Sequence, residues 1–404
     1  MSWHTLSSSQ VVSTKLAISV KANFGIAKVM PELKPATVAG GEGMSVPHTP
    51  RTIMIMAGGT GGHIFPALSV AEDLRARGWN VVWLGAKTGM EATLVTPKGY
   101  TMAWISMTGV RGKGVLRFAL LPMQLLIAFW QSARAIFAHR PDVVLGMGGY
   151  VSFPGGMMAS LLNRPLAIHE QNSIAGLANK VLAQIADRVL GGFPAPFGSS
   201  TAVIWTGNPV RDDIAALADP AARYSTRAGA LRLTVMGGSL GAQALNETVP
   251  NALALIPETE RPVVTHQAGT RHLAAVEENY QRAGVAATAV AFINDMAAQY
   301  AAADLIICRA GASTIAELAA AGIASVLVPF PHAVDDHQTH NARFLSGRGA
   351  AVLIPQAELT AQKLADLLRS FTREALLEMA KKARAVAKPD ATQAVASECM
   401  RLTA

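Results

Sequence analysis

Residues 52–63 read TIMIMAGGTGGH, and residues 231–243 read LRLTVMGGSLGAQ. In both stretches an apolar run leads into Gly-Gly, a hydroxyl residue (Thr60 or Ser239) and further glycine. This order is typical of a parallel strand that turns into a helix and presents backbone N–H groups and a helix N-terminus to an anion. Taken singly, either loop is equally compatible with a tight packing turn. Together they predict two Rossmann-type halves facing each other across a cleft, each with a phosphate-binding loop.

Composition limits the function classes. The chain has 404 residues, half of them hydrophobic, which fits two domains with large cores. Its net charge of +8 favours anionic partners such as phosphorylated substrates or acidic lipids. Nucleic acid is disfavoured, because no Lys/Arg run is interleaved with aromatic residues. The two cysteines provide neither a disulfide framework nor a CxxC metal site, so we expect a reducing, cytoplasmic setting.

The pattern along the chain predicts an α/β fold. Apolar strands alternate with helical segments in both halves, which favours parallel sheets covered by helices. Gly-Asn-Pro at positions 207–209 marks the join, so the domains are expected at residues 51–207 and 208–389. A C-terminal helix, residues 390–404, is expected to return to the first domain. The first 50 residues are predicted to be disordered, and an over-long start before Met44 is favoured over a transit peptide.

Residues 115–137 read VLRFALLPMQLLIAFWQSARAIF and predict an unusually apolar helix. Its uncharged run is shorter than the roughly 20 residues that a membrane-spanning helix needs. Two interpretations remain open: a core helix with solvated ends, or a helix lying in the membrane interface. The second would use an apolar patch ringed by cations, made of Phe118, Leu121, Leu125, Ile127 and Trp130 with Arg111, Lys113, Arg117 and Arg134.

Three more segments carry chemistry at predicted strand ends, where open α/β sheets bind their ligands. Residues 146–156, GMGGYVSFPGG, form a third glycine-rich turn that should line the same wall as the first. Residues 169–172, HEQN, place four polar side chains before a helix. Residues 308–317, CRAGASTIAE, place Glu317 where its carboxylate can accept hydrogen bonds from vicinal hydroxyls.

With these segments in this order, the chain from about Arg51 to its end resembles the bacterial undecaprenyldiphospho-muramoylpentapeptide β-N-acetylglucosaminyltransferases. The resemblance also rests on GNPVR, GGSLGA and VPFPHAVDDHQTHNA. It implies a GT-B fold and a hexosyltransferase that moves N-acetylglucosamine from UDP-N-acetylglucosamine to the 4-hydroxyl of the muramoyl sugar of lipid I. The anomeric carbon is inverted and lipid II is formed for peptidoglycan synthesis. It further implies peripheral attachment to the cytoplasmic face of the inner membrane, with an anionic membrane surface and cell-wall synthesis and division proteins as partners.

The resemblance also assigns residues to the two substrates. Uracil is expected near Ile293, the ribose hydroxyls on Glu317, and the sugar hydroxyls near Asn172, Gln338 and Asn341. The remaining donor contacts that it implies are Thr60, Gly61, Gly62, Arg211, Ser239, Ala312, Ser313 and Thr314. The acceptor, with its own diphosphate, is expected on the glycine loops of the first domain and at Gly149, Tyr150 and His169.

An inverting transfer needs a base for the acceptor hydroxyl and positive charge for the leaving diphosphate. The sequence has no D-x-D pattern for a metal, so no metal or other cofactor is expected. Helix N-termini and cationic side chains are expected to hold the donor diphosphate instead, through the loop at residues 237–242 with Ser239 and through Arg211. His63 is the leading candidate for the base, because it follows the first glycine loop. Glu170 and His169 remain rivals for this role.

Three other functions fit parts of the sequence. Another UDP-sugar enzyme of the same fold, such as a glycolipid glycosyltransferase or UDP-N-acetylglucosamine 2-epimerase, is disfavoured by HEQN and by the loop at residues 146–156. A non-catalytic nucleotide-sugar binding protein is disfavoured because donor and acceptor motifs are both present. A nicotinamide dehydrogenase is disfavoured because no acidic residue stands at a predicted strand end about 20 positions after either loop.

Overall fold

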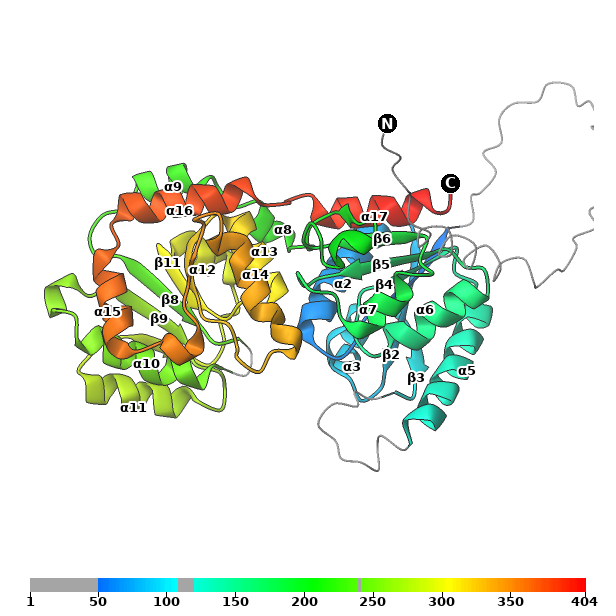
Figure 1. The fold of residues 1–404 in the computed structure, drawn as a ribbon, viewed down its shortest axis with the longest axis horizontal. Helices are drawn as coiled ribbons and strands as arrows, with labels where there is room; N and C mark the ends of the chain where they lie inside the picture. The colour runs from blue at the N-terminus through cyan, green and yellow to red at the C-terminus, as the bar shows by residue number, and fades with distance from the viewer. Residues whose placement is uncertain (1–49, 108–119, 239–240) are drawn as a thin grey trace, which may run out of the picture. The chain divides into compact units, whose positions relative to one another are not determined.

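A computed structural model describes residues 50–107, 120–238 and 241–404, the side chain of Val334 excepted. Within these residues the chain forms a seven-stranded and a six-stranded parallel sheet, each flanked by helices (Figure 1). The α/β fold class expected from the sequence is thereby confirmed. The expected N-terminal extension up to residue 49, the residues Arg111, Lys113, Arg117 and Phe118, and Ser239 of the second glycine loop lie outside the described residues.

The first sheet, with the helices packed on it, forms what we call the first lobe. Its strands run in the order β3-β2-β1-β4-β5-β6-β7. Their bounds are Thr52–Met56 (β1), Asn80–Ala86 (β2), Thr101–Ile105 (β3), Val143–Gly146 (β4), Leu166–Glu170 (β5), Arg188–Gly191 (β6) and Ile204–Trp205 (β7). Its helices are Gly61–Ala76 (α2), Met90–Leu94 (α3), Leu121–His139 (α5), Ser152–Leu161 (α6) and Leu177–Leu182 (α7).

The second sheet forms the second lobe, in the order β10-β9-β8-β11-β12-β13. Its strands are Arg232–Met236 (β8), Val263–Gln267 (β9), Thr288–Val290 (β10), Leu305–Cys308 (β11), Ala324–Leu327 (β12) and Val352–Leu353 (β13). The helices after β7 are Asp212–Ala215 (α8), Pro220–Ser225 (α9), Gln243–Ala254 (α10), Leu273–Ala283 (α11), Met296–Ala302 (α12), Ala312–Ala321 (α13), His337–Ser346 (α14), Ala361–Ser370 (α15), Arg373–Ala385 (α16) and Ala391–Arg401 (α17). Short 3₁₀ turns occur at Thr96–Lys98, Gly198–Ser200, Glu258–Glu260, Val334–Asp336 and Gln356–Glu358.

Strand β1 shows how the first lobe is held together. Successive side chains of a strand point to opposite faces, so Ile53 and Ile55 enter one core while Met54 and Met56 enter the other. All four are fully buried, which explains why the strand reads as a continuous apolar run. The first core also receives Val395 and Cys399 of α17, which packs beside α2 (Figure 1). The C-terminal helix therefore completes the core of the first lobe.

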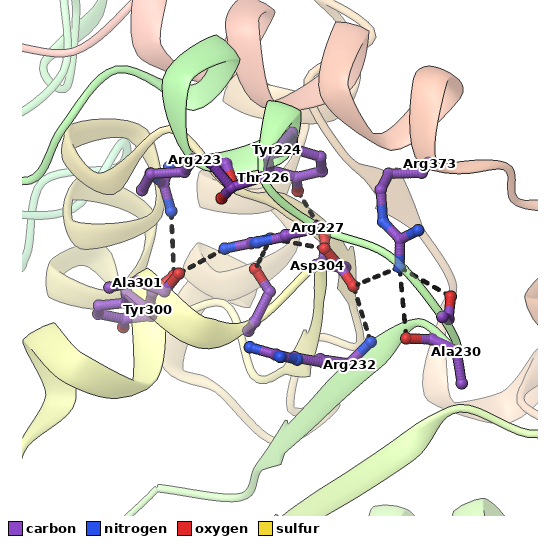
Figure 2. A network of polar contacts seen from close by, with 12 residues as sticks. Arg223, Tyr224, Thr226, Arg227, Ala230, Arg232, Tyr300, Ala301, Asp304 and Arg373 are labelled. Atoms are coloured by element: carbon purple, nitrogen blue, oxygen red, sulfur yellow. Dashed lines mark hydrogen bonds and ion pairs between the residues drawn. The ribbon is translucent and has the colours of Figure 1, made fainter.

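A buried ionic cluster joins the elements of the second lobe (Figure 2). Asp304, directly before β11, accepts hydrogen bonds from Arg227 Nη1 at 2.6 Å and from the backbone N–H of Arg232 at 2.8 Å. Arg373 from α16 lies 3.4 Å from Asp304 Oδ2, the oxygen that also accepts from the Arg232 N–H. Tyr224 donates to the Asp304 carbonyl oxygen at 2.6 Å, and burial raises the pKa of Tyr224 to about 12. This cluster ties α9 and α16 to the edge of the sheet where β8 and β11 begin.

Candidate active site

The strand order reverses at one point in each sheet. In the first sheet it reverses between β1 and β4, and in the second between β8 and β11. Loops that leave the carboxyl ends of two such strands diverge and open a crevice for a ligand. All four glycine-containing segments noted in the sequence follow these four strands, at residues 57–62, 147–151, 237–242 and 309–311.

The two loops of the first lobe contact each other closely. A Cβ atom on Gly149, which has φ +81°, would overlap the carbonyl oxygen of Gly58. A Cβ on Gly148, with φ +94°, would lie 2.6 Å from His63 Nδ1. Glycine is therefore required at both positions, by conformation and by space. Tyr150 is half-buried beside Gly59, and burial, followed by the charge of Glu91, raises the pKa of its phenol.

His63 lies in the first turn of α2, just after the partly exposed residues Thr60, Gly61 and Gly62. Its ring is half-buried, and its Nδ1 lies 2.9 Å from Gln171 Oε1. Gln171 is itself buried and donates from Nε2 to the Met147 carbonyl oxygen at 2.8 Å. The imidazole is therefore held between the two glycine loops and the end of β5.

His169 differs from the expectation of an acceptor contact, because it is completely buried. Its Nε2 lies 2.9 Å from the Gly207 carbonyl oxygen and its Nδ1 lies 3.1 Å from Gln171 Nε2. Burial lowers the pKa of His169 to about 4, although the hydrogen bond to Gly207 and the nearby Glu170 oppose this. The ring is neutral at pH 7, and both of its nitrogens have partners within the protein.

Glu170 is also buried, and its carboxylate receives four hydrogen bonds. Oε1 accepts from the backbone N–H of Asn172 at 2.9 Å and from its side chain at 3.2 Å. Oε2 accepts from the backbone N–H of Gly176 at 3.1 Å and from Asn179 Nδ2 at 2.9 Å. These donors occupy both carboxylate oxygens, so this carboxylate orders the loop between β5 and α7.

Glu91 is a site residue that the sequence did not indicate. Its side chain is fully buried, although no basic partner follows it in the local sequence. It accepts hydrogen bonds from the backbone N–H groups of Ala86 at 2.8 Å and Gly59 at 3.3 Å. The carboxylate thus uses one of the N–H groups of the first glycine loop and fixes the path of that loop. Only the tertiary structure reveals the contact with Gly59, because α3 and the loop after β1 are 32 residues apart in sequence.

In the second lobe, α13 begins directly after the turn that follows β11. Gly311 is its N-cap residue and provides no side chain, so the first N–H groups of the helix, at Ala312, Ser313 and Thr314, are available to an anion. Ile293, by contrast, is buried and packs in the core next to this end of the sheet.

Glu317 lies one turn further along α13 and is half-buried. Its Oε2 accepts a hydrogen bond from the fully buried Tyr300 at 2.9 Å. Burial raises the pKa of the Glu317 carboxyl, whereas the Tyr300 hydrogen bond and the charge of Arg211 lower it. Arg211, exposed at the start of α8, lies 3.6 Å from Asp213 in a weak ion pair. Tyr300 therefore holds one carboxylate oxygen and leaves the other for a ligand.

The side chains expected around the sugar, Asn172, Gln338 and Asn341, lie near one another. Asn341 Oδ1 accepts from the backbone N–H of Ser173 at 2.8 Å, and its Nδ2 lies 3.3 Å from Asn172 Oδ1. Gln338 Oε1 accepts from the backbone N–H groups of Ala310 at 3.2 Å and Phe330 at 2.9 Å. The amides of α14 are therefore anchored to the loops after β5, β11 and β12.

Helix α5 presents a broad apolar surface outside the crevice. Trp130 is 63% exposed and Leu126 is 68% exposed, whereas Leu125 is half-buried and packs against the core. We call the outward side chains of this helix the α5 face: Met123, Leu126, Ile127, Trp130 and Phe137. Arg134 lies over the Trp130 ring at 5.8 Å. Among the described residues, no helix combines the length and hydrophobicity required to cross a membrane.

The comparisons with known proteins cover both lobes. The model of the glycosyltransferase family 28 N-terminal domain matches residues 53–191, and that of the C-terminal domain matches residues 232–395. Among curated proteins, the UDP-N-acetylglucosamine–N-acetylmuramyl-(pentapeptide) pyrophosphoryl-undecaprenol N-acetylglucosamine transferase of Nitrosospira multiformis is 61% identical over 87% of this chain and 99% of its own. The transferase of the same name from Cupriavidus metallidurans is 60% identical over 88% and 99%.

Solved structures agree with this result. MurG of Acinetobacter baumannii is 40% identical, with a TM-score of 0.77, over 87% of this chain and 100% of that one. The calicheamicin glycosyltransferase CalG4 is only 15% identical, with a TM-score of 0.60, over 88% and 98%, and so shares the fold alone.

Proposed function

Because the chain belongs to glycosyltransferase family 28, and within it to the UDP-N-acetylglucosamine–N-acetylmuramyl-(pentapeptide) pyrophosphoryl-undecaprenol N-acetylglucosamine transferases, we propose that it forms lipid II from lipid I. It is a hexosyltransferase. The 4-hydroxyl of the muramoyl sugar attacks the anomeric carbon of N-acetylglucosamine, the bond to UDP breaks, and the configuration inverts. The observation that carries this proposal is the 61% identity to a relative that is matched over 99% of its length.

His63 is our choice for the general base. It lies between the two glycine loops of the first lobe, and its Nε2 has no protein partner among the described hydrogen bonds. The buried, fully bonded side chains of His169 and Glu170 are instead assigned to ordering the loop. In this scheme residues 51–207 with the C-terminal helix 390–404 hold the acceptor, and its diphosphate lies on the loops around Gly61 and Gly149, with Tyr150 as a further acceptor contact. Residues 208–389 hold the donor.

The donor diphosphate would lie at the N-terminus of α13, where the helix dipole and free N–H groups favour negative charge. Arg211 adds a full positive charge near Glu317. The ribose hydroxyls would donate to Glu317, the uracil would lie by Ile293, and the sugar would meet Asn172, Gln338 and Asn341.

The test of the reaction is an acceptor comparison with radiolabelled UDP-N-acetylglucosamine. We expect label transfer to a lipid I analogue and none to diacylglycerol. Formation of UDP-N-acetylmannosamine without acceptor would indicate the epimerase instead, and tight donor binding without any product would indicate a binding protein.

Chelation tests the source of the positive charge. Because helix N–H groups and Arg211 are assigned to the leaving diphosphate, treatment with EDTA should leave substantial turnover in steady-state assays. Complete loss of turnover that Mg²⁺ restores would refute this part of the proposal.

Substitution of Glu317 tests the donor site. We expect Glu317→Ala to raise the donor KM about 10- to 150-fold, since charged hydrogen bonds contribute roughly 1.5–3 kcal/mol. Tyr300→Phe keeps the carboxylate but frees one oxygen, so the donor KM should rise less. An unchanged donor KM in Glu317→Ala would remove this residue from the site.

We further propose that the protein is peripheral at the cytoplasmic face of the inner membrane and attaches there through the α5 face. Large exposed apolar side chains beside Arg134 are typical of a helix that lies in the interface of an anionic leaflet. This placement would keep the acceptor's lipid chain in the membrane while its sugar reaches the crevice. Proteins of cell-wall synthesis and division are the partners expected at this membrane.

Flotation with anionic vesicles tests the α5 face. The parent protein should float with the vesicles and be released as salt rises, because Debye screening acts over about 8–10 Å at physiological salt. Leu126→Gln with Trp130→Gln should weaken vesicle binding tenfold or more, given roughly 1.5–3 kcal/mol per buried large side chain, without lowering Tm. The control Leu125→Gln, on the core side, should lower Tm instead. Failure of the parent to float would refute the proposal.

A further inference from the structure

We propose that Gln171 is a positioning residue that fixes His63 in the neutral tautomer whose Nε2 is free to accept a proton. The inference rests on the proposed role of His63 as the base and adds the group that makes this role available. It is drawn from a chain of hydrogen bonds that runs from Gly207 through His169 and Gln171 to His63.

The orientation of the Gln171 amide follows from its surroundings. One end of the amide lies 2.8 Å from the carbonyl oxygen of Met147 and 3.2 Å from that of His169. Carbonyl oxygens only accept hydrogen bonds, so this end must be the NH₂ group. The other end, which faces His63, is therefore the oxygen.

The orientation of the amide determines the proton on His63. Gln171 Oε1 can only accept, and it lies 2.9 Å from His63 Nδ1. In the neutral imidazole Nδ1 therefore carries the hydrogen, and Nε2 keeps its lone pair. The other tautomer would place two lone pairs against each other. The hydrogen bond of one ring nitrogen thus sets the chemistry of the other.

His169 supplies a second anchor for the same amide. Its Nε2 faces the Gly207 carbonyl oxygen and must be protonated, so its Nδ1 accepts from Gln171 Nε2 at 3.1 Å. The low pKa of His169, about 4, caused first by burial, keeps Nδ1 free of a proton at pH 7. A charged His169 would remove this acceptor and favour a flipped amide. One histidine therefore orients the amide, and the amide orients the other histidine.

Neighbouring residues hold the Gln171 amide and the His63 ring in position. Asn208 Nδ2 donates to the Gln171 carbonyl oxygen at 2.9 Å, so the residue is fixed at both its main chain and its side chain. Gly148 leaves room for the contact between the amide and the ring, because a Cβ atom at this position would lie 2.6 Å from His63 Nδ1 and 3.3 Å from Gln171 Oε1. All of these residues belong to the first lobe or to the turn that ends it.

The experiment combines ¹⁵N NMR of the histidine rings with steady-state kinetics on the whole protein. The ring ¹⁵N shifts report the tautomer directly, without substrate, and His63→Ala identifies the signals. Gln171→Met removes the hydrogen bonds at similar volume, and Gln171→Glu keeps an acceptor toward His63. Asn246→Leu is the matched control, because Asn246 is a buried amide that bonds His266 in the second lobe, away from this chain.

We expect His63 in the parent to be protonated at Nδ1. Gln171→Met should populate the other tautomer. It should lower kcat about tenfold or more, up to the roughly 10²–10⁴-fold that a general base contributes. The KM values for donor and acceptor should change little. Gln171→Glu should keep the tautomer, because a carboxylate oxygen still accepts from His63 Nδ1, but kcat should fall, because its second oxygen cannot donate to the carbonyl oxygens of Met147 and His169. Asn246→Leu should lower Tm without affecting the His63 signals or kcat.

The outcomes separate this inference from the function on which it rests. An unchanged tautomer in Gln171→Met, or an inverted one in Gln171→Glu, overturns the positioning role whatever the kinetics. If the tautomer changes in Gln171→Met while kcat does not, Gln171 does orient the ring, but His63 is not the base. Should Gln171→Met fail to fold, Gln171→Leu, which also lacks an acceptor toward His63 Nδ1, provides the same test.

Discussion

Replacement of His63 by alanine should lower kcat by about 10²- to 10⁴-fold while the donor KM stays close to that of the parent. The reason is that the imidazole is assigned to remove the proton of the acceptor hydroxyl, which occurs only during bond formation. The uridine diphosphate would be bound by α13 in the other lobe, so donor binding should persist. Steady-state kinetics with saturating lipid I analogue measures both parameters.

The matched control is His139→Ala at the end of α5, which removes a histidine from the same lobe outside the crevice. We expect parent kinetics from it. Parent-like kcat in His63→Ala would exclude His63 as the base. Glu170 would then be the next candidate for the base. Its carboxylate would first have to lose the hydrogen bonds that it accepts from Asn172, Gly176 and Asn179.

The largest effect on stability is expected from Asp304→Ala, which should lower the free energy of unfolding by about 3–5 kcal/mol. The Asp304 side chain is 1% exposed and that of Arg227 is 7% exposed, so removing the carboxylate leaves a buried guanidinium without its counter-ion. Arg373 and the N–H of Arg232 lose the same partner (Figure 2). Urea denaturation of the purified protein measures the loss.

The control for charge alone is Glu358→Ala, which breaks an exposed ion pair with Lys363. Exposed pairs contribute about 0–1 kcal/mol, so this variant should unfold close to the parent. If Asp304→Ala and Glu358→Ala lowered the free energy of unfolding equally, the structural role assigned to the cluster would be contradicted. The cluster lies at the N-terminal ends of β8 and β11, whereas the proposed site lies at their C-terminal ends. Asp304→Ala protein that remains folded should therefore retain kcat.

Much of the fold follows from local patterns. The strands β1, β4, β8 and β11 read as apolar runs before glycine, since both of their faces are buried, and the pattern predicts them directly. Strands β3 and β6 have weaker sequence patterns, because TMAWI begins with an exposed threonine and RVLG is short and begins with an arginine. The sequence also does not predict which face of α5 packs against the core, because the helix is apolar on nearly every side. Leu125 packs inward and Leu126 faces solvent, although they are chemically identical neighbours.

For the site, the sequence located the loops but not the side chains that support them. Glu91, Gln171 and Tyr300 act through contacts with segments distant in the chain, and no local spacing predicts such contacts. The resemblance assigns His169 to the acceptor, and His169 and Glu170 are both rivals of His63 for the role of base. Both point instead into the protein, where backbone carbonyl and N–H groups of neighbouring loops bind them.

The most direct test of the central claim is the structure of the product made from UDP-N-acetylglucosamine and a short-chain lipid I analogue, determined by NMR. The account predicts one new disaccharide, with N-acetylglucosamine joined through a β linkage to the 4-hydroxyl of the muramoyl sugar and with one UDP released per bond. An α linkage, attachment at another hydroxyl, or UDP release without a new glycosidic bond would contradict it.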